Sequence, residues 1–293
     1  MTTSRAKANG IEIAYETFGE RGARPLLLVM GLGTQMLAWH EDLCQQLADR
    51  GHFVIRFDNR DIGLSTHLSD APPPDLMAAF TGDTSSASYR LEDMADDAAG
   101  LLDALEIDSA HVVGASMGGM IAQTLALRHR DRVRSLTSIM STPSPAIGAA
   151  TEEAVAVLLA PPASSRDEAV ERSVLTYEIV GSPDYPLDVP WLTGVAGEAY
   201  DRAYDPLGVA RQLLAIHASG DRTEALHGLR VPTLVVHGDR DPLVQLEGGR
   251  ATAAAIPEAE LLVLPGMGHN LPRELWPTIL EAISRLTDRA ESA

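Results

Sequence analysis

Ser116 is the residue whose surroundings carry the clearest chemical signal. It lies at the centre of a Gly-x-Ser-x-Gly motif within residues 110–120, which read AHVVGASMGGM. A short apolar run of strand length precedes the motif, and residues 120–127 follow it with helical spacing of apolar side chains. On such a tight turn, side chains larger than hydrogen at Gly114 and Gly118 would collide. The pattern predicts a nucleophile elbow; the alternative is a glycine-rich turn that carries a bystander serine.

A serine hydroxyl needs a base to take its proton, and the chain offers nine histidines. His269 has the best position, since it follows the predicted strand 260–264 in a glycine-punctuated loop that opens the last helix, at the edge where the elbow also points. His111 and His237 lie in predicted strands, where a packed imidazole is the commoner role. Solvent exposure is the expectation for the rest, which are His40, His52, His67, His129, His217 and His227.

The base in turn needs an acid to orient it, and two aspartates follow the predicted strand 231–237. Asp239 comes directly after Gly238, so its carboxylate is expected to cap backbone N–H groups of the turn. Asp241 lies two residues further on and is better placed to reach the imidazole. The other candidate position, after the strand that ends at Met140, has no carboxylate.

Two backbone N–H groups are candidates for stabilising an oxyanion. The Met117 N–H lies at the start of the helix that follows the serine, beside the point where the oxyanion would form. The second donor is expected after the strand 25–30, where we assign the Leu32 N–H between Gly31 and Gly33. The alternative for this loop is an ordinary strand-to-helix turn.

Strands and helices alternate over most of the chain, which predicts a mostly parallel, doubly wound sheet with helices on both faces. Residues 25–30 are apolar at every position, as in a strand covered on both faces. Residues 10–18 alternate between apolar and polar, as in a half-exposed strand of an antiparallel edge hairpin. The other predicted strands are 52–57, 110–115, 132–140, 231–237 and 260–264, and the helices are 38–50, 90–105, 117–127 and 272–287.

Two segments interrupt this alternation. Residues 64–89 contain three consecutive prolines and a polar cluster, which predicts a long loop of the kind that often forms lids or binding segments. Residues 143–228 contain short helical patterns punctuated by prolines. We expect the second segment to be a helical cap inserted into a core formed by residues 1–142 and 229–293.

Composition excludes several classes of function. The formal charge of −18 argues against nucleic acids and anionic membrane surfaces as partners. Lys7 is the only lysine, so Schiff-base chemistry is not expected, and Cys44 is the only cysteine, so no intrachain disulfide can form. No histidine pair with a carboxylate has metal-ligand spacing. No apolar run reaches the length of a membrane span, and the first ten residues are polar, so a cytoplasmic location is expected.

Taken together, these motifs resemble those of the α/β-hydrolase superfamily, and within it the aclacinomycin methylesterase branch. The matching segments are 26–31, 55–66, 111–118, 231–234 with Asp241 and Pro242, and 265–269. The likeness implies an α/β-hydrolase fold and a catalytic triad of Ser116 as nucleophile, His269 as general base and acid, and Asp241 as its orienter. It also implies a small-molecule ester substrate and no cofactor or metal. The oxyanion loop reads MGLG from Met30, where the commoner family pattern is His-Gly-x-Pro.

The predicted cap is rich in tyrosine and contains no phenylalanine. Its rings could form an aromatic pocket for a ring-bearing ester, together with Gly31 near the serine, or they could be the small core of the cap itself. As a hypothesis we favour the methyl ester of a bulky or polyketide-like acid. The rings concerned are Tyr177, Tyr185, Trp191, Tyr200 and Tyr204.

Other activities use the same triad, and the sequence leaves them open. Thioesterases, lipases, carbon–carbon bond hydrolases and cofactor-free perhydrolases are the enzymatic alternatives. Outside enzymes, ligand receptors of this fold retain the triad. The sequence does not indicate the oligomeric state.

Overall fold

Eight strands form one sheet in the computed structural model, which describes residues 2–292. The strand order is β1-β2-β4-β3-β5-β6-β7-β8, and only β1 and β2 run antiparallel to their neighbours. This arrangement confirms the predicted mostly parallel, doubly wound sheet. The strands are β1 (Ser4–Ala8), β2 (Ile11–Phe18), β3 (Arg24–Val29), β4 (His52–Phe57), β5 (Ala110–Ala115), β6 (Val133–Ile139), β7 (Thr233–Gly238) and β8 (Glu260–Leu264).

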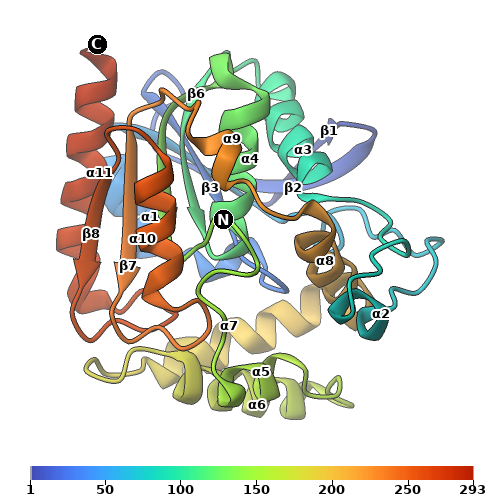
Figure 1. Cartoon of the computed structure of the whole chain (residues 1–293). Coiled ribbons are helices and arrows are strands. Elements are labelled where there is room, and N and C mark those ends of the chain that lie inside the picture. Colours follow the sequence, from blue (N-terminus) through green and yellow to red (C-terminus); the bar gives the residue numbers. More distant parts are fainter. Residues whose placement is uncertain (1, 293) are drawn as a thin grey trace.

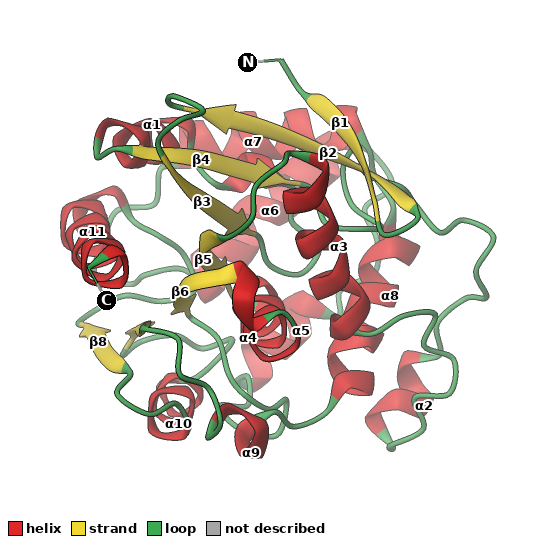
Figure 2. Ribbon diagram, turned by 90° about the horizontal axis from the view of Figure 1, so that it is seen from above, coloured by secondary structure: helices red, strands yellow, loops and turns green. Residues whose placement is uncertain are grey.

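Helices cover both faces of the sheet, with α1 and α11 on one face and α3, α4 and α10 on the other (Figure 2). No helix among residues 2–292 has the length and apolar character needed to cross a membrane. The helices are α1 (Glu41–Asp49), α2 (Leu76–Phe80), α3 (Leu91–Ala104), α4 (Met117–Arg128), α5 (Glu152–Leu158), α6 (Arg166–Val180), α7 (Val189–Arg202), α8 (Pro206–Ser219), α9 (Thr223–Leu226), α10 (Leu246–Ala255) and α11 (Trp276–Glu291), with three short 3-10 turns at Met36–Ala38, Arg130–Arg132 and Arg273–Leu275.

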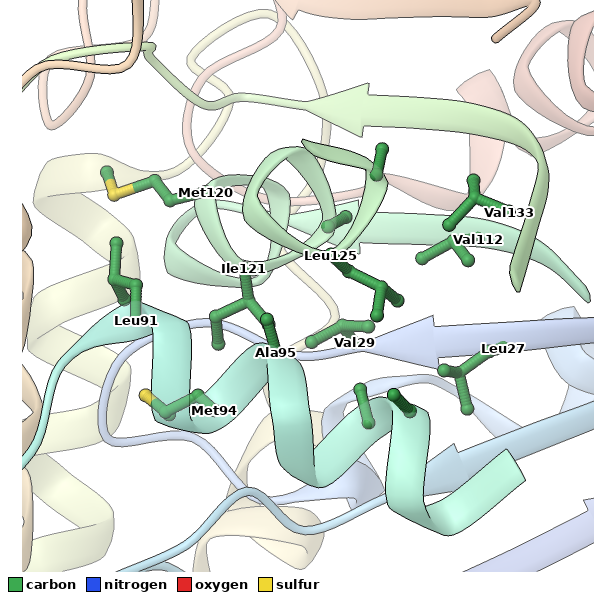
Figure 3. Packing of buried hydrophobic residues seen from close by; sticks show 14 of the residues in the cluster. Leu27, Val29, Leu91, Met94, Ala95, Val112, Met120, Ile121, Leu125 and Val133 are labelled. Carbon is green, nitrogen blue, oxygen red and sulfur yellow. The ribbon is translucent and has the colours of Figure 1, made fainter. Parts of the chain in front are cut away.

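From Leu26 to Val29 the β3 strand is apolar because both of its faces are buried there. Leu27 and Val29 pack against α3 and α4, where Ile121 and Leu125 lie over the sheet (Figure 3). Leu28 belongs to the core on the opposite face, under α1 and α11. Burying a leucine side chain of this kind contributes about 2 kcal/mol to the free energy of unfolding, so this strand anchors the centre of the sheet.

The β2 strand is more buried than its alternating sequence predicts. It lies between β1 and β4, so Glu16 is almost fully enclosed and its carboxylate accepts a 3.0 Å hydrogen bond from the Arg56 Nε. Burial alone would raise the pKa of Glu16, but the hydrogen bonds from Arg56 and Thr3 hold it below its usual value. The sequence pattern did not reveal this pairing because the two residues are on different strands.

Between β6 and β7 the chain forms α5 to α9. Helices α5, α6 and α7 lie beyond the carboxyl ends of β7 and β8, at the bottom of Figure 1. Helix α8 packs beside α2 and α3, and α9 packs against α4 and α10. The predicted loop 64–89 contains the short helix α2, whose first turn is capped by Asp75 through the Ala78 N–H. A single helical turn is too short to give a periodic pattern in the sequence.

Cys44 lies in α1, fully buried in the core. Burial raises the pKa of its thiol to about 12, so the group stays protonated and behaves as a small apolar side chain.

His111 on β5 predicts a loss of stability in acid. Its ring is buried, its Nδ1 lies 2.8 Å from the Ser135 Oγ, and burial lowers its pKa to about 4 even though Glu291 lies nearby. A histidine whose pKa is depressed by folding stabilises the protein above its unfolded pKa of about 6.5, and this stability is lost as the pH falls. We expect about 2 kcal/mol of stability to be lost between pH 8 and pH 5 through this group.

Urea unfolding at both pH values measures this contribution. The His111→Gln variant should show a pH dependence that is smaller by that amount, whereas replacement of the exposed His227 by Gln should leave the dependence unchanged. An equal pH dependence in wild type and His111→Gln would contradict the assignment.

Candidate active site

The turn between β5 and α4 holds Ser116 in a strained backbone conformation, with φ 57° and ψ −123°. Its N–H donates to the Ile139 carbonyl at 2.9 Å, which fixes the turn to β6. A Cβ at Gly114 would lie 2.1 Å from the Gly118 carbonyl oxygen, and a Cβ at Gly118 would lie 2.1 Å from that of Val29. The two glycines are therefore required by close backbone packing, as expected for an elbow.

Replacing Gly118 by Ala is expected to destabilise the protein by about 3 kcal/mol, because the added methyl group meets rigid backbone. The matched control is Gly194→Ala in α7, where an added Cβ meets no atom within 4 Å and alanine favours the helix. Thermal unfolding should show a marked fall of the Tm for the first variant and no fall for the second. Equal Tm values for both variants would show that the elbow tolerates a side chain.

The structure brings Ser116, His269 and Asp241 together at the carboxyl edge of the sheet. The His269 Nε2 lies 2.9 Å from the Ser116 Oγ, and its Nδ1 lies 2.7 Å from the Asp241 Oδ2. His269 lies in the loop after β8, and its backbone N–H donates to the Val180 carbonyl at the end of α6, 2.7 Å away. The loop that carries the imidazole is therefore hydrogen-bonded to the end of α6.

The surroundings of Asp241 determine which nitrogen of His269 is protonated. The carboxylate is buried, and its Oδ1 accepts hydrogen bonds from the Leu243 and Val244 N–H groups, both at 2.9 Å. Its Oδ2 is left to face the imidazole. Because a carboxylate only accepts hydrogen bonds, the His269 Nδ1 must carry the proton, which leaves the Nε2 of the neutral ring free to accept one from the serine.

Asp239 has a separate structural role. Its Oδ1 accepts the Gly266 N–H at 2.7 Å, so it links the loop after β7 to the loop after β8. This agrees with the expectation that Asp239 caps backbone N–H groups, although the N–H belongs to the neighbouring loop.

The Leu32 and Met117 N–H groups donate to no other described residue. The neighbouring Gly33 N–H donates to the Gln212 Oε1 of α8 at 2.9 Å, so the loop after β3 is held by a distant helix. The Asn59 side chain donates to the Met30 carbonyl at 2.9 Å from the other side. The sequence analysis identified neither Gln212 nor Asn59 as a support of this loop. Asn59 lies in the polar run 58–61, which follows β4 and is buried in the structure. A run of polar residues directly after a predicted strand is the signal that could have identified Asn59.

A cavity of about 830 Å³ lies between the sheet edge and helices α5 to α8. Ser116 and His269 line it, and so do Gly31, Tyr177 and Trp191 among the residues expected to bind substrate.

His217 lies in the cavity wall, against Phe80 of α2, which corrects the expectation that His217 faces solvent. The same expectation is wrong for His52, which is fully buried, with its Nε2 3.1 Å from the Thr287 Oγ1.

Three of the expected tyrosines have other contacts. The Tyr185 hydroxyl donates to the Pro265 carbonyl at 3.0 Å. Tyr200 and Tyr204 pack against each other with ring centroids 4.8 Å apart, and the Tyr204 hydroxyl accepts the Ala163 N–H. Tyr200 and Tyr204 therefore pack within the helical segment, and Tyr185 contacts the loop after β8; none of the three lines the cavity.

Asp61, His67 and Asp205 form the one group among residues 2–292 with a spacing that could hold a metal ion. The Arg211 guanidinium already pairs with both aspartates of this group, with hydrogen bonds of 2.8 and 2.9 Å to the two Asp61 oxygens and one of 3.4 Å to Asp205. A cation would meet this positive charge, so the group fits an ion-pair network that joins α8 to the loop after β4.

The sequence of this chain is similar to those of known hydrolases. A family model described as alpha/beta hydrolase fold matches residues 24–161, and one described as TAP-like protein matches residues 216–279. The chain is 26% identical to rhodomycin D methylesterase DauP of Streptomyces sp. (strain C5) over 99% of both chains. It is 30% identical to 2-(acetamidomethylene)succinate hydrolase of Mesorhizobium japonicum, covering 92% of this chain and 90% of that one.

Among solved structures, the enol-lactonase from Burkholderia xenovorans LB400 matches with a TM-score of 0.76 and 25% sequence identity. The match covers 97% of this chain and all of the other. These matches, and the methylesterase above all, confirm the resemblance that the sequence motifs predicted.

Proposed function

Because the chain belongs to the α/β-hydrolase family, we propose that it cleaves a carboxylic ester through an acyl-enzyme formed on Ser116. The observation that carries this proposal is the hydrogen-bonded chain from the Ser116 Oγ to His269 at 2.9 Å and from His269 to Asp241 at 2.7 Å, at the wall of a large cavity. Relatives named as methylesterases and other hydrolases support an ester hydrolase.

In the first half of the reaction, His269 Nε2 takes the hydroxyl proton as the Ser116 Oγ attacks the ester carbonyl. The Asp241 carboxylate stabilises the imidazolium that forms. The tetrahedral intermediate collapses, the carbon–oxygen bond to the alcohol breaks, and the alcohol leaves with the proton from His269. In the second half, His269 takes a proton from water as the water oxygen attacks the acyl carbonyl. The bond between that carbon and the Ser116 Oγ then breaks, His269 returns the proton to the Oγ, and the acid leaves.

We assign the oxyanion hole to the Leu32 and Met117 N–H groups. Both are unused by other described residues, and Met117 begins α4, where the helix dipole favours negative charge. The Gln212 and Asn59 side chains hold the Leu32 loop in place before substrate arrives. Such preorganised donors stabilise charge that develops in the transition state.

For the substrate we propose the methyl ester of a bulky or polyketide-like acid. The cap is the segment 143–228, and together with the sheet edge it encloses a cavity that is large enough for a ring-bearing acyl group. Tyr177 and Trp191 offer aromatic surface there. The methylesterase relatives favour the methyl ester over a longer alcohol.

A substrate panel tests this choice. We expect methyl esters of large aromatic acids to be hydrolysed with a higher kcat/KM than short acyl esters of the same alcohol. A clear preference for short acyl esters would remove the bulky-acid proposal, and a preference for thioesters or long-chain lipids would favour the corresponding alternative. Turnover only with added hydrogen peroxide would identify a perhydrolase, and tight binding without turnover would identify a receptor.

A further inference from the structure

The cavity wall contains few Asp, Glu, Lys or Arg side chains. Most of its lining is hydrocarbon, for example Met120, Leu213 and Ile216. The acidic and basic side chains in the wall are Asp188, Arg273 and Glu274. Arg273 is already paired there, with its Nη1 3.0 Å from Asp42 and its Nε 3.2 Å from Asp188. Since Arg273 is the only Lys or Arg side chain in the wall of this cavity among the described residues, no unpaired cation is available there for an anionic group of a ligand.

Among the uncharged polar side chains in the wall are two ring-bearing ones, Tyr177 from α6 and His217 from α8. Neither makes a hydrogen bond to another described side chain or backbone group. The His217 ring is held in place by Phe80, which packs against it edge to face with ring centroids 5.3 Å apart. Burial raises the pKa of Tyr177 and lowers the pKa of His217, so both are uncharged at neutral pH.

A ligand that fills this cavity displaces water from both groups. If it offers only hydrocarbon, a phenol hydroxyl and an imidazole are left without partners, which weakens binding by roughly ten- to a hundredfold for each group. If it carries an oxygen at the right place, the phenol can donate to it and the neutral imidazole can donate or accept. Sites built in this way discriminate strongly between ligands that have or lack the polar group.

We propose that Tyr177 and His217 are specificity-determining residues that bind uncharged oxygen substituents of the substrate other than its reacting ester group. The inference rests on the proposed function and narrows it to bulky, neutral esters that carry a hydroxyl or carbonyl group. Esters with a second, ionised carboxylate are rejected, because the cavity would bury that charge without a partner.

Binding to the Ser116→Ala variant tests this inference separately from the chemistry. The probes are methyl 2-naphthoate, its 5-, 6- and 7-hydroxy derivatives, and the monomethyl ester of naphthalene-2,6-dicarboxylate, with Kd measured by naphthalene fluorescence. We expect at least one hydroxyl derivative to bind tenfold or more tightly than the unsubstituted ester, and the carboxylate to bind at least tenfold more weakly than that ester.

Adding Tyr177→Phe or His217→Leu to this variant should reduce the advantage of the hydroxyl group to less than threefold, because methyl 2-naphthoate then binds more tightly once the unpaired polar group is gone. The controls Tyr15→Phe and His227→Leu, both outside the cavity wall, should keep the advantage. Equal Kd values for hydroxylated and unsubstituted esters, or an advantage that survives both cavity substitutions, would overturn the inference. Failure of wild type to hydrolyse any ester that Ser116→Ala binds would overturn only the proposed function.

Discussion

Replacing Ser116 by Ala should lower kcat by about 10⁴- to 10⁶-fold and leave substrate binding almost unchanged. The hydroxyl is the atom that attacks the ester in the proposed mechanism, and no other serine hydroxyl is hydrogen-bonded to His269 among the described residues. The alanine side chain fits the turn, since it only removes the oxygen, so the Tm should stay close to that of wild type.

The control for this variant is Ser141→Ala. Ser141 is also buried near the elbow, against Gly119, but its Oγ has no hydrogen-bond partner among the described residues. Its kcat should stay within about twofold of wild type. A Ser116→Ala protein that is folded and retains more than a hundredth of the wild-type kcat would contradict the nucleophile assignment.

Replacing Asp241 by Asn should lower kcat by about 10⁴-fold. The Leu243 and Val244 N–H groups both point at one oxygen of this side chain, so an asparagine must place its carbonyl oxygen there. Its NH₂ group then faces the His269 Nδ1, which becomes an acceptor. The imidazole is forced into the tautomer with a proton on Nε2, and that nitrogen can no longer accept the proton of Ser116.

Asp239→Asn is the matched comparison, because it makes the same change two residues away. An amide oxygen can still accept the Gly266 N–H, so kcat should fall by less than about tenfold. Steady-state kinetics on one ester substrate measures both variants. If Asp241→Asn were no slower than Asp239→Asn, the orienting role of Asp241 would be refuted.

The fold and the candidate triad could be predicted because their signals are local. The apolar run of β3 and the glycines around Ser116 each encode a strand or a turn within a few residues. Asp241 and His269 could be found because the carboxyl ends of parallel strands meet at one edge of a sheet, so their positions after β7 and β8 were informative.

The missed features depend on contacts between distant parts of the chain. Gln212 lies in the middle of α8, and nothing nearby in the sequence indicates that it holds the Gly33 N–H. His217 lies one and a half turns further along α8 and was expected at the surface. The sequence around a histidine does not indicate which distant helix packs over its side chain. The tyrosines of the cap had two possible roles for the same reason, and only their packing separates Tyr177 from Tyr200.

The most direct test of the central claim is the reaction of the folded protein with a fluorophosphonate probe, followed by intact-mass and peptide mass spectrometry. We expect one adduct per chain, on Ser116, that is absent from Ser116→Ala and forms much more slowly in His269→Gln, because the hydroxyl is nucleophilic only beside its base. Folded wild-type protein that remains unlabelled, or carries the label on another residue, would contradict the account.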